Sequence, residues 1–136
     1  MSSIKLDIVS SSESLFSGEV EMVSASGVAG ELGIYPNHTP LLTLIAPGEV
    51  RYKQGGEQKS MYVSGGILEV QPHHVTILAD TAIRAKELDE AKILQAKESA
   101  EKELESQRGD IDMDEVKARL SEMTLKLKLV RKYKNK

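Results

Sequence analysis

The sequence predicts a β + α protein, in which an N-terminal antiparallel β-sandwich is followed by a C-terminal antiparallel two-helix hairpin. All four prolines and nine of the ten glycines lie before residue 73, where apolar residues alternate with the period of strands. After residue 86 proline is absent, and residues that favour helices dominate. We therefore assign residues 1–86 to the sandwich and residues 87–136 to the hairpin.

The expected strands of the first part are marked by short apolar alternations. These are Ile4/Leu6/Ile8, Val20/Met22, Val50/Tyr52, Leu68/Val70 and Val75/Ile77/Ala79. The turn signals between them are Ser17-Gly18, Pro47-Gly48, Gly55-Gly56 and Gly65-Gly66, the last of which we interpret as a hairpin turn or a bulge. Many short strands at close spacing are typical of an antiparallel sandwich or barrel.

The segment from Gly30 to Leu42 combines two glycines and two prolines with polar side chains. Pro36 and Pro40 fix their own φ and push the residues before them into extended conformations, while the glycines permit angles closed to other residues. We interpret the segment as a rigid turn that displays Glu31 and His38 to a partner. An ordinary connection between strands is the alternative.

Two helices are expected after residue 86. Gly109 ends the first, and Asp112 with Glu115 three positions later is a capping pattern that opens the second. The second helix carries one apolar seam at heptad spacing, formed by Met113, Val116, Leu120, Met123, Leu127 and Val130. The first has a thinner apolar face, chiefly Leu88, Ala91, Leu94, Ala100 and Leu104. An antiparallel hairpin brings the two faces together.

Charge divides the helical part into two segments of opposite sign. Residues 87–115 carry 4 basic and 11 acidic side chains, and residues 116–136 carry 8 basic and 1 acidic. One interpretation is a solvated helix pair held together partly by opposite charge. The other is a detachable basic rod that meets an acidic surface elsewhere. The rod would consist of Lys126, Lys128, Arg131, Lys132, Lys134 and Lys136.

The residue types present exclude several kinds of catalytic and metal site. Without cysteine the chain has no disulfide, thiolate metal site or cysteine nucleophile. It also lacks a Walker-type loop, a serine nucleophile elbow and a metal-spaced cluster of histidines and carboxylates. The adjacent His73 and His74 suit a turn after Pro72 better than a shared metal. We expect no catalytic residues and no metal.

Composition also limits the partners. No stretch approaches the roughly 18 apolar residues that span a bilayer, and the N-terminus does not resemble a signal peptide, so we expect a soluble cytoplasmic protein without membrane insertion. An aromatic content of 4% and a pI near 5.7 argue against nucleic acid.

Five stretches resemble those of the epsilon subunit of the bacterial F-type ATP synthase, in the same order and at the same spacing. They are Phe16-Ser17-Gly18, Gly30 to Leu42, Ser64 to Val70, Leu78 to Ala82 and the helical hairpin. The resemblance covers essentially the whole chain. It implies a sandwich at the foot of the central stalk, bound to the gamma subunit and to the polar loops of the c-ring. It also implies helices that fold down on the sandwich or rise along gamma to block ATP hydrolysis.

For this chain, the resemblance implies a non-catalytic rotor subunit of a proton-translocating ATP synthase. Such a subunit couples c-ring rotation to ATP synthesis and inhibits hydrolysis. It is a monomer within a hetero-oligomer, peripheral on the cytoplasmic face of the bacterial inner membrane. The expected contacts with the c-ring and gamma are Glu31, Tyr35, His38 and Leu42, of which Glu31 and His38 are expected to face the c-ring. The expected contacts of the extended hairpin with the alpha and beta subunits are Arg119, Lys126, Lys128, Arg131 and Lys132.

Some members of that family bind ATP through an Ile/Leu-Asp-x-x-Arg-Ala motif on the first helix, together with arginines of the second. The matching stretch here runs from Leu88 to Ile93, with Asp89 and Lys92 as the candidate ligands. Lys92 supplies a point charge where the motif has a two-pronged arginine, and Ile93 replaces a small alanine. These differences argue against ATP, and we expect no bound cofactor.

The apolar seam gives a physical reason for a movable hairpin. An isolated helix of about 20 residues is marginal in water, so the seam needs a partner, and the sequence does not determine which one. Burying six such side chains contributes on the order of 10 kcal/mol in either docked state, which leaves a small difference between the states. The alternative to a rotor subunit is a stand-alone β-sandwich protein-binding module whose seam forms a coiled-coil dimer.

Overall fold

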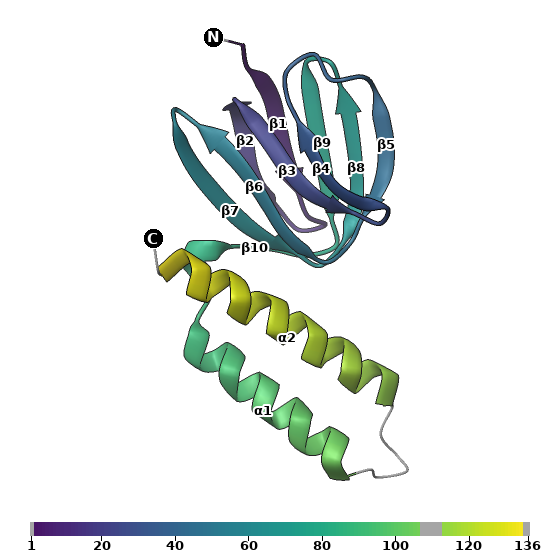
Figure 1. Ribbon diagram of the computed structural model, residues 1–136, viewed down its shortest axis with the longest axis vertical. Helices are drawn as coiled ribbons and strands as arrows, with labels where there is room; N and C mark the ends of the chain where they lie inside the picture. The colour runs from purple at the N-terminus through teal and green to yellow at the C-terminus, as the bar shows by residue number, and fades with distance from the viewer. Residues whose placement is uncertain (1, 107–112, 135–136) are drawn as a thin grey trace. The chain divides into compact units, whose positions relative to one another are not determined.

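The computed structural model describes residues 2–106 and 113–134, and it confirms a β-sandwich followed by two helices (Figure 1). The chain divides into two compact units, Met1–Arg84 and Ala85–Lys136. The boundary between them lies two residues before the one that we predicted. Our expectations for Gly109 and Asp112 lie outside the described residues.

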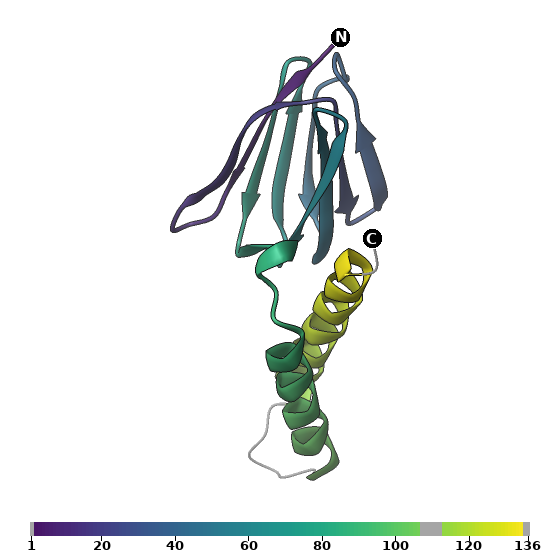
Figure 2. The ribbon, with the colours of Figure 1, turned by 90° about the vertical axis from the view of Figure 1, so that its left-hand side faces the viewer.

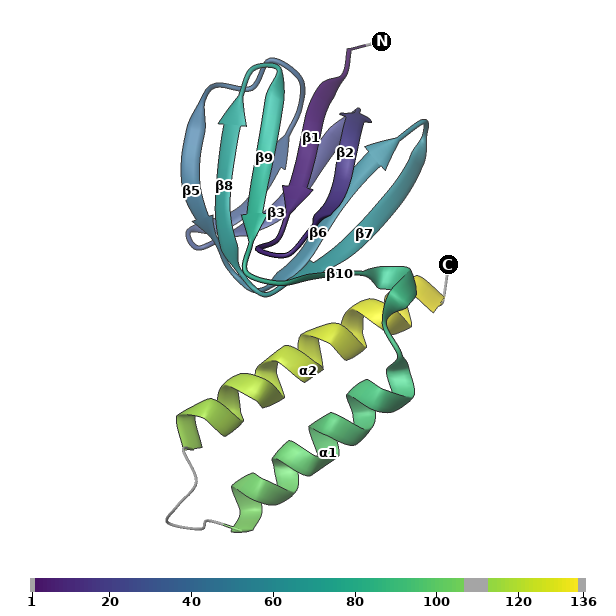
Figure 3. The same ribbon diagram turned by 180° about the vertical axis from the view of Figure 1, so that it is seen from behind.

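The described residues include ten strands, which form two layers of one continuously paired sheet (Figures 1 to 3). The first layer contains β10 (Ala82–Arg84), β7 (Glu57–Val63), β6 (Gly48–Gln54), β3 (Met22–Gly27) and β4 (Gly30–Ile34), in that order. The second contains β5 (Leu41–Ile45), β8 (Gly66–Gln71), β9 (His74–Ala79), β1 (Ile4–Val9) and β2 (Ser14–Val20). One residue pair, Gly27 with Ile45, joins β3 to β5 and so connects the layers.

Strand direction departs from the prediction at one place in the second layer. β1 pairs with β9 in parallel, from Lys5 opposite His74 to Val9 opposite Leu78. The other pairings between described strands are antiparallel. The N-terminal strand therefore lies inside its layer, between β9 and β2, and not at an edge.

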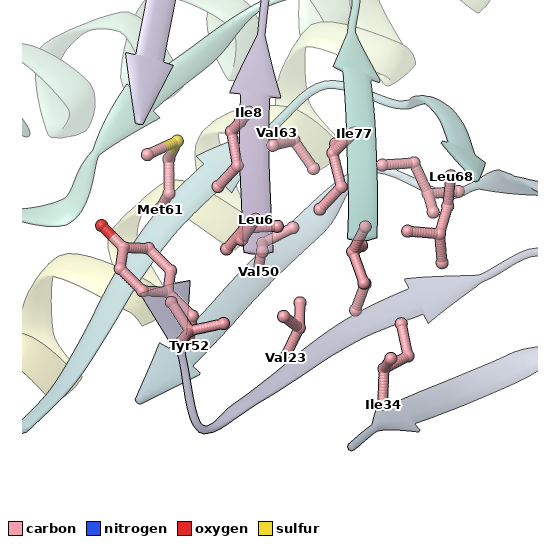
Figure 4. Packing of buried hydrophobic residues seen from close by; sticks show 14 of the residues in the cluster. Leu6, Ile8, Val23, Ile34, Val50, Tyr52, Met61, Val63, Leu68 and Ile77 are labelled. Atoms are coloured by element: carbon pink, nitrogen blue, oxygen red, sulfur yellow. The ribbon is translucent and has the colours of Figure 1, made fainter. Parts of the chain in front are cut away.

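The core lies between the layers and follows from the period-two pattern. In β1 the even-numbered residues Ile4, Leu6 and Ile8 are buried, while Lys5 is exposed. Figure 4 shows Leu6, Ile8, Leu68 and Ile77 from the second layer facing Val23, Ile34, Val50 and Met61 from the first. At one side, Phe16 of β2 and Tyr52 of β6 join the two layers, since the centroids of their rings lie 4.4 Å apart.

Some turn signals were interpreted correctly and others were wrong. Gly55-Gly56 connects β6 to β7 as a hairpin, with φ of 59° and 79°. Ser17-Gly18 is not a turn, because both residues lie inside β2 opposite Asp7 and Leu6. Val20 and Met22 do not share a strand, since β2 ends at Val20 and β3 begins at Met22.

Gly65-Gly66 is neither a hairpin turn nor a bulge, because β7 and β8 do not pair and lie in different layers. This crossover runs beside the connection from β9 to β10. The Ser64 and Asp80 amides donate to the carbonyls of Thr81 and Gly65, both at 3.0 Å, and the Thr81 amide donates to Ser64 Oγ at 2.9 Å. Two of the stretches on which the family resemblance rests therefore meet in space.

The second unit contains a 3-10 turn, Ala85–Glu87, and the helices α1 (Glu90–Ser106) and α2 (Met113–Lys134). α1 begins after Asp89, whose Oδ1 accepts hydrogen bonds from the amides of Ala91 and Lys92 at 3.0 and 3.3 Å. Asp89 is thus an N-cap, which satisfies amides that the first turn leaves unpaired. Neither described helix is long and apolar enough to cross a bilayer.

One apolar cluster between the helices contains Ile93 of α1 with Leu127 and Val130 of α2. All six residues of the predicted α2 seam are buried or half-buried. The predicted face of α1 was partly wrong, because Ala91 and Leu94 are exposed. The start of α1 at Glu90 turns Ile93 inward in their place.

Candidate functional site

A row of exposed apolar side chains crosses the outer face of the second layer. Leu44 of β5 lies opposite Ile67 of β8, and Ile67 lies opposite Leu78 of β9. These three residues, the apolar row, are 58%, 42% and 51% exposed, and Leu42, two positions before Leu44, is 70% exposed. Val28 extends the patch, since its amide donates to the Leu44 carbonyl at 3.2 Å and its side chain is exposed. Neighbouring exposed apolar side chains of this kind make the face a candidate docking site.

Away from the apolar row, the same outer face becomes polar. Asp7 of β1 is opposite Ser17 of β2 and Thr76 of β9, and its Oδ2 lies 2.6 Å from His74 Nε2. The hydrogen bond from the Ser17 side chain lowers the pKa of Asp7 below its ordinary value of 3.8; partial burial opposes this, and the His74 hydrogen bond assists it. The ionised carboxylate therefore fastens β1 to both of its neighbours.

We expect Asp7→Asn to reduce the stability of the sandwich at pH 5 to 6 by less than about 1 kcal/mol, the range of exposed ion pairs. The folded-state pKa of Asp7 is depressed, so its contribution is complete above the ordinary value of 3.8 and is lost as the pH falls through the folded-state value. Urea unfolding of both proteins between pH 6 and pH 2.5 checks this. A difference in stability that grows toward low pH would contradict it.

Glu31 lies in a strand, which corrects our interpretation of Gly30 to Leu42 as one turn. It occupies β4 opposite Ser26, and its carboxylate oxygen Oε1 accepts a hydrogen bond from Ser24 Oγ at 3.0 Å. The same oxygen forms an ion pair with Arg51 of β6, which also approaches Glu49. One oxygen of the exposed Glu31 carboxylate is therefore held by its own layer.

The predicted contact residues do not share one rim. Glu31 lies near the β3–β4 turn, whereas Tyr35 and His38 follow the opposite end of β4, about 13 Å away at 3.3 Å per residue. There Asn37 has a left-handed φ of 67° and its amide donates to the Pro72 carbonyl at 2.8 Å. Alternating Leu32 and Ile34 turn inward, so Gly33 between them belongs to a strand.

A shallow hollow opens between β4 and β5, beside Glu31. Its lining residues are Gly27, Ala29, Gly30, Glu31, Leu32, Leu41 and Thr43. Gly30 has a φ of 136°, and a Cβ added there would meet nothing within 4 Å. The hollow is mostly apolar with one carboxylate at its edge, which suits a partner loop that carries a small apolar residue next to a hydrogen-bond donor.

The candidate basic residues of α2 differ in their surroundings. Arg119 and Arg131 form ion pairs with Glu103 and Glu90 of α1. Lys126 pairs with Glu122 within α2 and is 12% exposed on its side chain, so it does not belong to an open basic rod. Lys128 and Lys132 are exposed. The side chain of Lys134 and all of Lys136 lie outside what the structure describes.

The structure places both candidate nucleotide ligands at the start of α1. Asp89 directs Oδ1 to the amides of its own helix, and Lys92, on the following turn, is exposed. Among the described residues, no three His, Asp or Glu side chains gather as metal ligands would.

The sequence analysis proposed Leu42 as a contact but did not single out Leu44, Ile67 and Leu78. The signal was partial. β5 carries Leu42 and Leu44 on its outward side, but the outward positions of β8 and β9 also include polar residues such as Glu69 and Thr76. That Leu44, Ile67 and Leu78 form one row follows only from the pairing register.

Comparison with known proteins gives one family and a consistent set of relatives. Residues 3–85 match the family model described as the ATP synthase, Delta/Epsilon chain, beta-sandwich domain. The chain is 51% identical to the ATP synthase epsilon chain of Acinetobacter baylyi over 137 aligned positions, which cover 100% of this chain and 99% of that one. The ATP synthase epsilon chains of Polaromonas naphthalenivorans and Psychrobacter arcticus are 50% and 49% identical with the same coverage.

Solved structures share the fold at much lower identity. A chain of the Euglena gracilis mitochondrial ATP synthase, solved with its c-ring, superposes with a TM-score of 0.73 at 21% identity, over 99% of this chain and 81% of that one. A chain from the structure of the central stalk and c-ring of the Tetrahymena thermophila mitochondrial ATP synthase gives a TM-score of 0.61 at 13% identity, over 93% of this chain and 96% of that one. At such identities the likeness concerns the fold alone.

Proposed function

Since the chain belongs to the family of ATP synthase epsilon chains, which are accessory, non-catalytic subunits, we propose that it couples c-ring rotation to ATP synthesis. We also propose that it inhibits ATP hydrolysis. In this role it is peripheral on the cytoplasmic face of the bacterial inner membrane, bound to a proton-translocating complex. The observation that carries the docking role is the exposed apolar row. The full-length match to the family favours this function over a stand-alone dimeric module.

The apolar row is the proposed contact with the gamma subunit. Leu44, Ile67 and Leu78 lie on adjacent strands of a rigid layer, so a partner that covers them removes apolar surface from water without reordering the sandwich. Leu42 beside the row belongs to the same contact. Tyr35 and His38 follow the end of β4 that is remote from Glu31. We therefore propose both for a second part of the gamma surface, although the sequence had suggested His38 for the c-ring.

Glu31 is the proposed contact with the polar loops of the c-ring. Arg51 and Ser24 hold one carboxylate oxygen, so the side chain has a fixed direction and offers the other oxygen to a partner. The hollow beside it accepts the small side chains of an approaching loop.

The helical unit is the proposed inhibitory element. Its α2 helix carries Arg119, Lys126, Lys128, Arg131 and Lys132, which contact acidic segments of the alpha and beta subunits when the hairpin extends. Its apolar seam packs on α1 in the described hairpin, and an extended state needs an equivalent apolar surface on gamma. The capping role of Asp89 and the exposed position of Lys92 keep ATP out of the proposal.

The docking role is tested by Ile67→Glu in the full-length chain. Binding of gamma would remove the new carboxylate at the centre of the apolar row from water without giving it an opposite charge. We therefore expect the affinity for purified gamma subunit to fall at least about tenfold. Titration calorimetry measures this directly. Ile67 points outward from β8, so the fold of the sandwich is expected to survive.

Gln58→Glu is the matched control. It adds the same charge at an exposed strand position, in β7 of the first layer, away from the apolar row and from Tyr35 and His38. We expect it to bind gamma like the unmodified chain. If both variants bind equally well, the apolar row is not the gamma contact.

A further inference from the structure

The two arginines proposed for inhibition are already ion-paired inside the hairpin. Arg131 Nε lies 3.0 Å from Glu90 Oε1, and Arg119 Nη2 lies 2.5 Å from Glu103 Oε2. Both pairs cross from α2 to α1, so each must break when the helices separate. The carboxylates of α1 thus occupy the same groups that an acidic partner would contact.

The spacing of the two pairs is matched on the two helices. Glu90 and Glu103 are 13 positions apart on α1, and Arg119 and Arg131 are 12 apart on α2, which gives about 20 and 18 Å at 1.5 Å per residue. The apolar contact of Ile93 with Leu127 and Val130 lies near the Glu90 pair. The Glu103 pair fastens the other end of the hairpin.

A third ion pair of the hairpin behaves differently when the helices separate. Lys126 Nζ lies 2.9 Å from Glu122 Oε1, four positions earlier on the same helix. This pair lies within α2, so it persists whether or not α1 is present, provided that α2 remains helical. Glu122 therefore supplies an internal reference for the loss of one negative charge.

We propose that Glu90 and Glu103 are internal competitors of the catalytic head, which hold Arg131 and Arg119 in the closed hairpin and so set how often these arginines are available for inhibition. The proposal rests on the inhibitory function assigned above to the extended hairpin. It adds a specific regulatory element, the acidic face of α1.

The competition arises because Arg119 and Arg131 can pair either with the carboxylates of α1 or with those of an acidic partner. The pairs are partly exposed, so each contributes modestly and is screened by salt over a Debye length of about 8 to 10 Å. On opening, the arginines lose the glutamates and regain carboxylates only if an acidic surface is present. Removing the glutamate charges favours the open state and leaves the arginines intact for the partner.

The test compares E90Q/E103Q with E122Q in the full-length chain. The chain has no cysteine, so Ser99→Cys and Ser121→Cys, at exposed positions on α1 and α2, allow specific labelling with a fluorescent donor and acceptor. We expect the ratio of open to closed hairpin to rise about two- to thirtyfold in E90Q/E103Q, the effect of losing two exposed ion pairs. E122Q should leave it unchanged, and added salt should open the unmodified hairpin more than the double variant.

Two readouts separate this inference from the function on which it rests. If E90Q/E103Q opens the hairpin of the isolated full-length chain no more than E122Q does, the proposal of internal competition is wrong, whatever the enzyme assay gives. If it opens the hairpin and the assembled ATP synthase hydrolyses ATP more slowly, both proposals are supported. If it opens the hairpin and hydrolysis is unchanged, the competition is supported and the inhibitory function is overturned.

Discussion

Truncation after Lys86 should raise ATP hydrolysis by the assembled ATP synthase several-fold, with the sandwich still present in the complex. The truncation removes residues 87–136, and with them every candidate inhibitory cation. The sandwich keeps its own core, since Met1–Arg84 forms a compact unit around residues of both layers. The measurements are the ATPase rate of the purified complex and the amount of truncated chain that it retains.

A full-length variant separates the effect of charge from the effect of length. Glutamine at Arg119, Lys126, Lys128, Arg131 and Lys132 should also raise hydrolysis, whereas glutamine at Lys97 and Lys102 of α1 should not. Unchanged hydrolysis in a complex that retains the truncated chain would overturn the inhibitory role and leave the rotor role standing. Loss of the truncated chain from the complex would show that the sandwich does not suffice for docking.

Gly66→Ala should lower the free energy of unfolding of the sandwich by about 2 to 4 kcal/mol or prevent folding altogether. Gly66 has a φ of 149°, which side chains rarely permit. A Cβ there would lie 2.1 Å from the Leu78 carbonyl oxygen and 2.9 Å from the Ala79 Cα. These are backbone atoms of β9, so relief of the clash would separate β8 from its neighbour. Chemical denaturation followed by circular dichroism measures the loss.

Gly33→Ala is the control for Gly66→Ala. Gly33 also lies in a strand, but its φ is not in the left-handed region and no heavy atom lies within 4 Å of an added Cβ. We expect its stability to stay within about 0.5 kcal/mol of the unmodified chain. Equal stability of the two alanine variants would contradict the steric argument at Gly66.

The sequence predicted the fold where one local pattern was sufficient. Alternating Ile4, Leu6 and Ile8 identified β1, because inward positions of a strand recur with period two. Glycines were misleading where they lay inside strands, as at Gly18, where the lack of a side chain avoids close contact with Phe16 and Gln54. The parallel register of β1 with β9 was beyond prediction, because it depends on residues about 70 positions apart.

The candidate site was less predictable than the fold, because it depends on which residues become neighbours. The exposure of Ile67 follows from the place of β8 between β5 and β9, which no local pattern determines. The pairing of Glu31 with Arg51 joins residues 20 positions apart, and that of Arg131 with Glu90 joins residues 41 positions apart. The charge separation of the hairpin predicted attraction between the helices, but not which arginine meets which glutamate.

The parallel pairing of β1 with β9 also has a consequence for biosynthesis. During N-to-C synthesis, β1 can pair with β2 early, but its other edge has no partner until residues 74–79 have been made. Long-range pairing of this kind slows folding and leaves a strand edge open to the wrong partner in the meantime. We expect the nascent chain to depend on chaperones until β9 emerges.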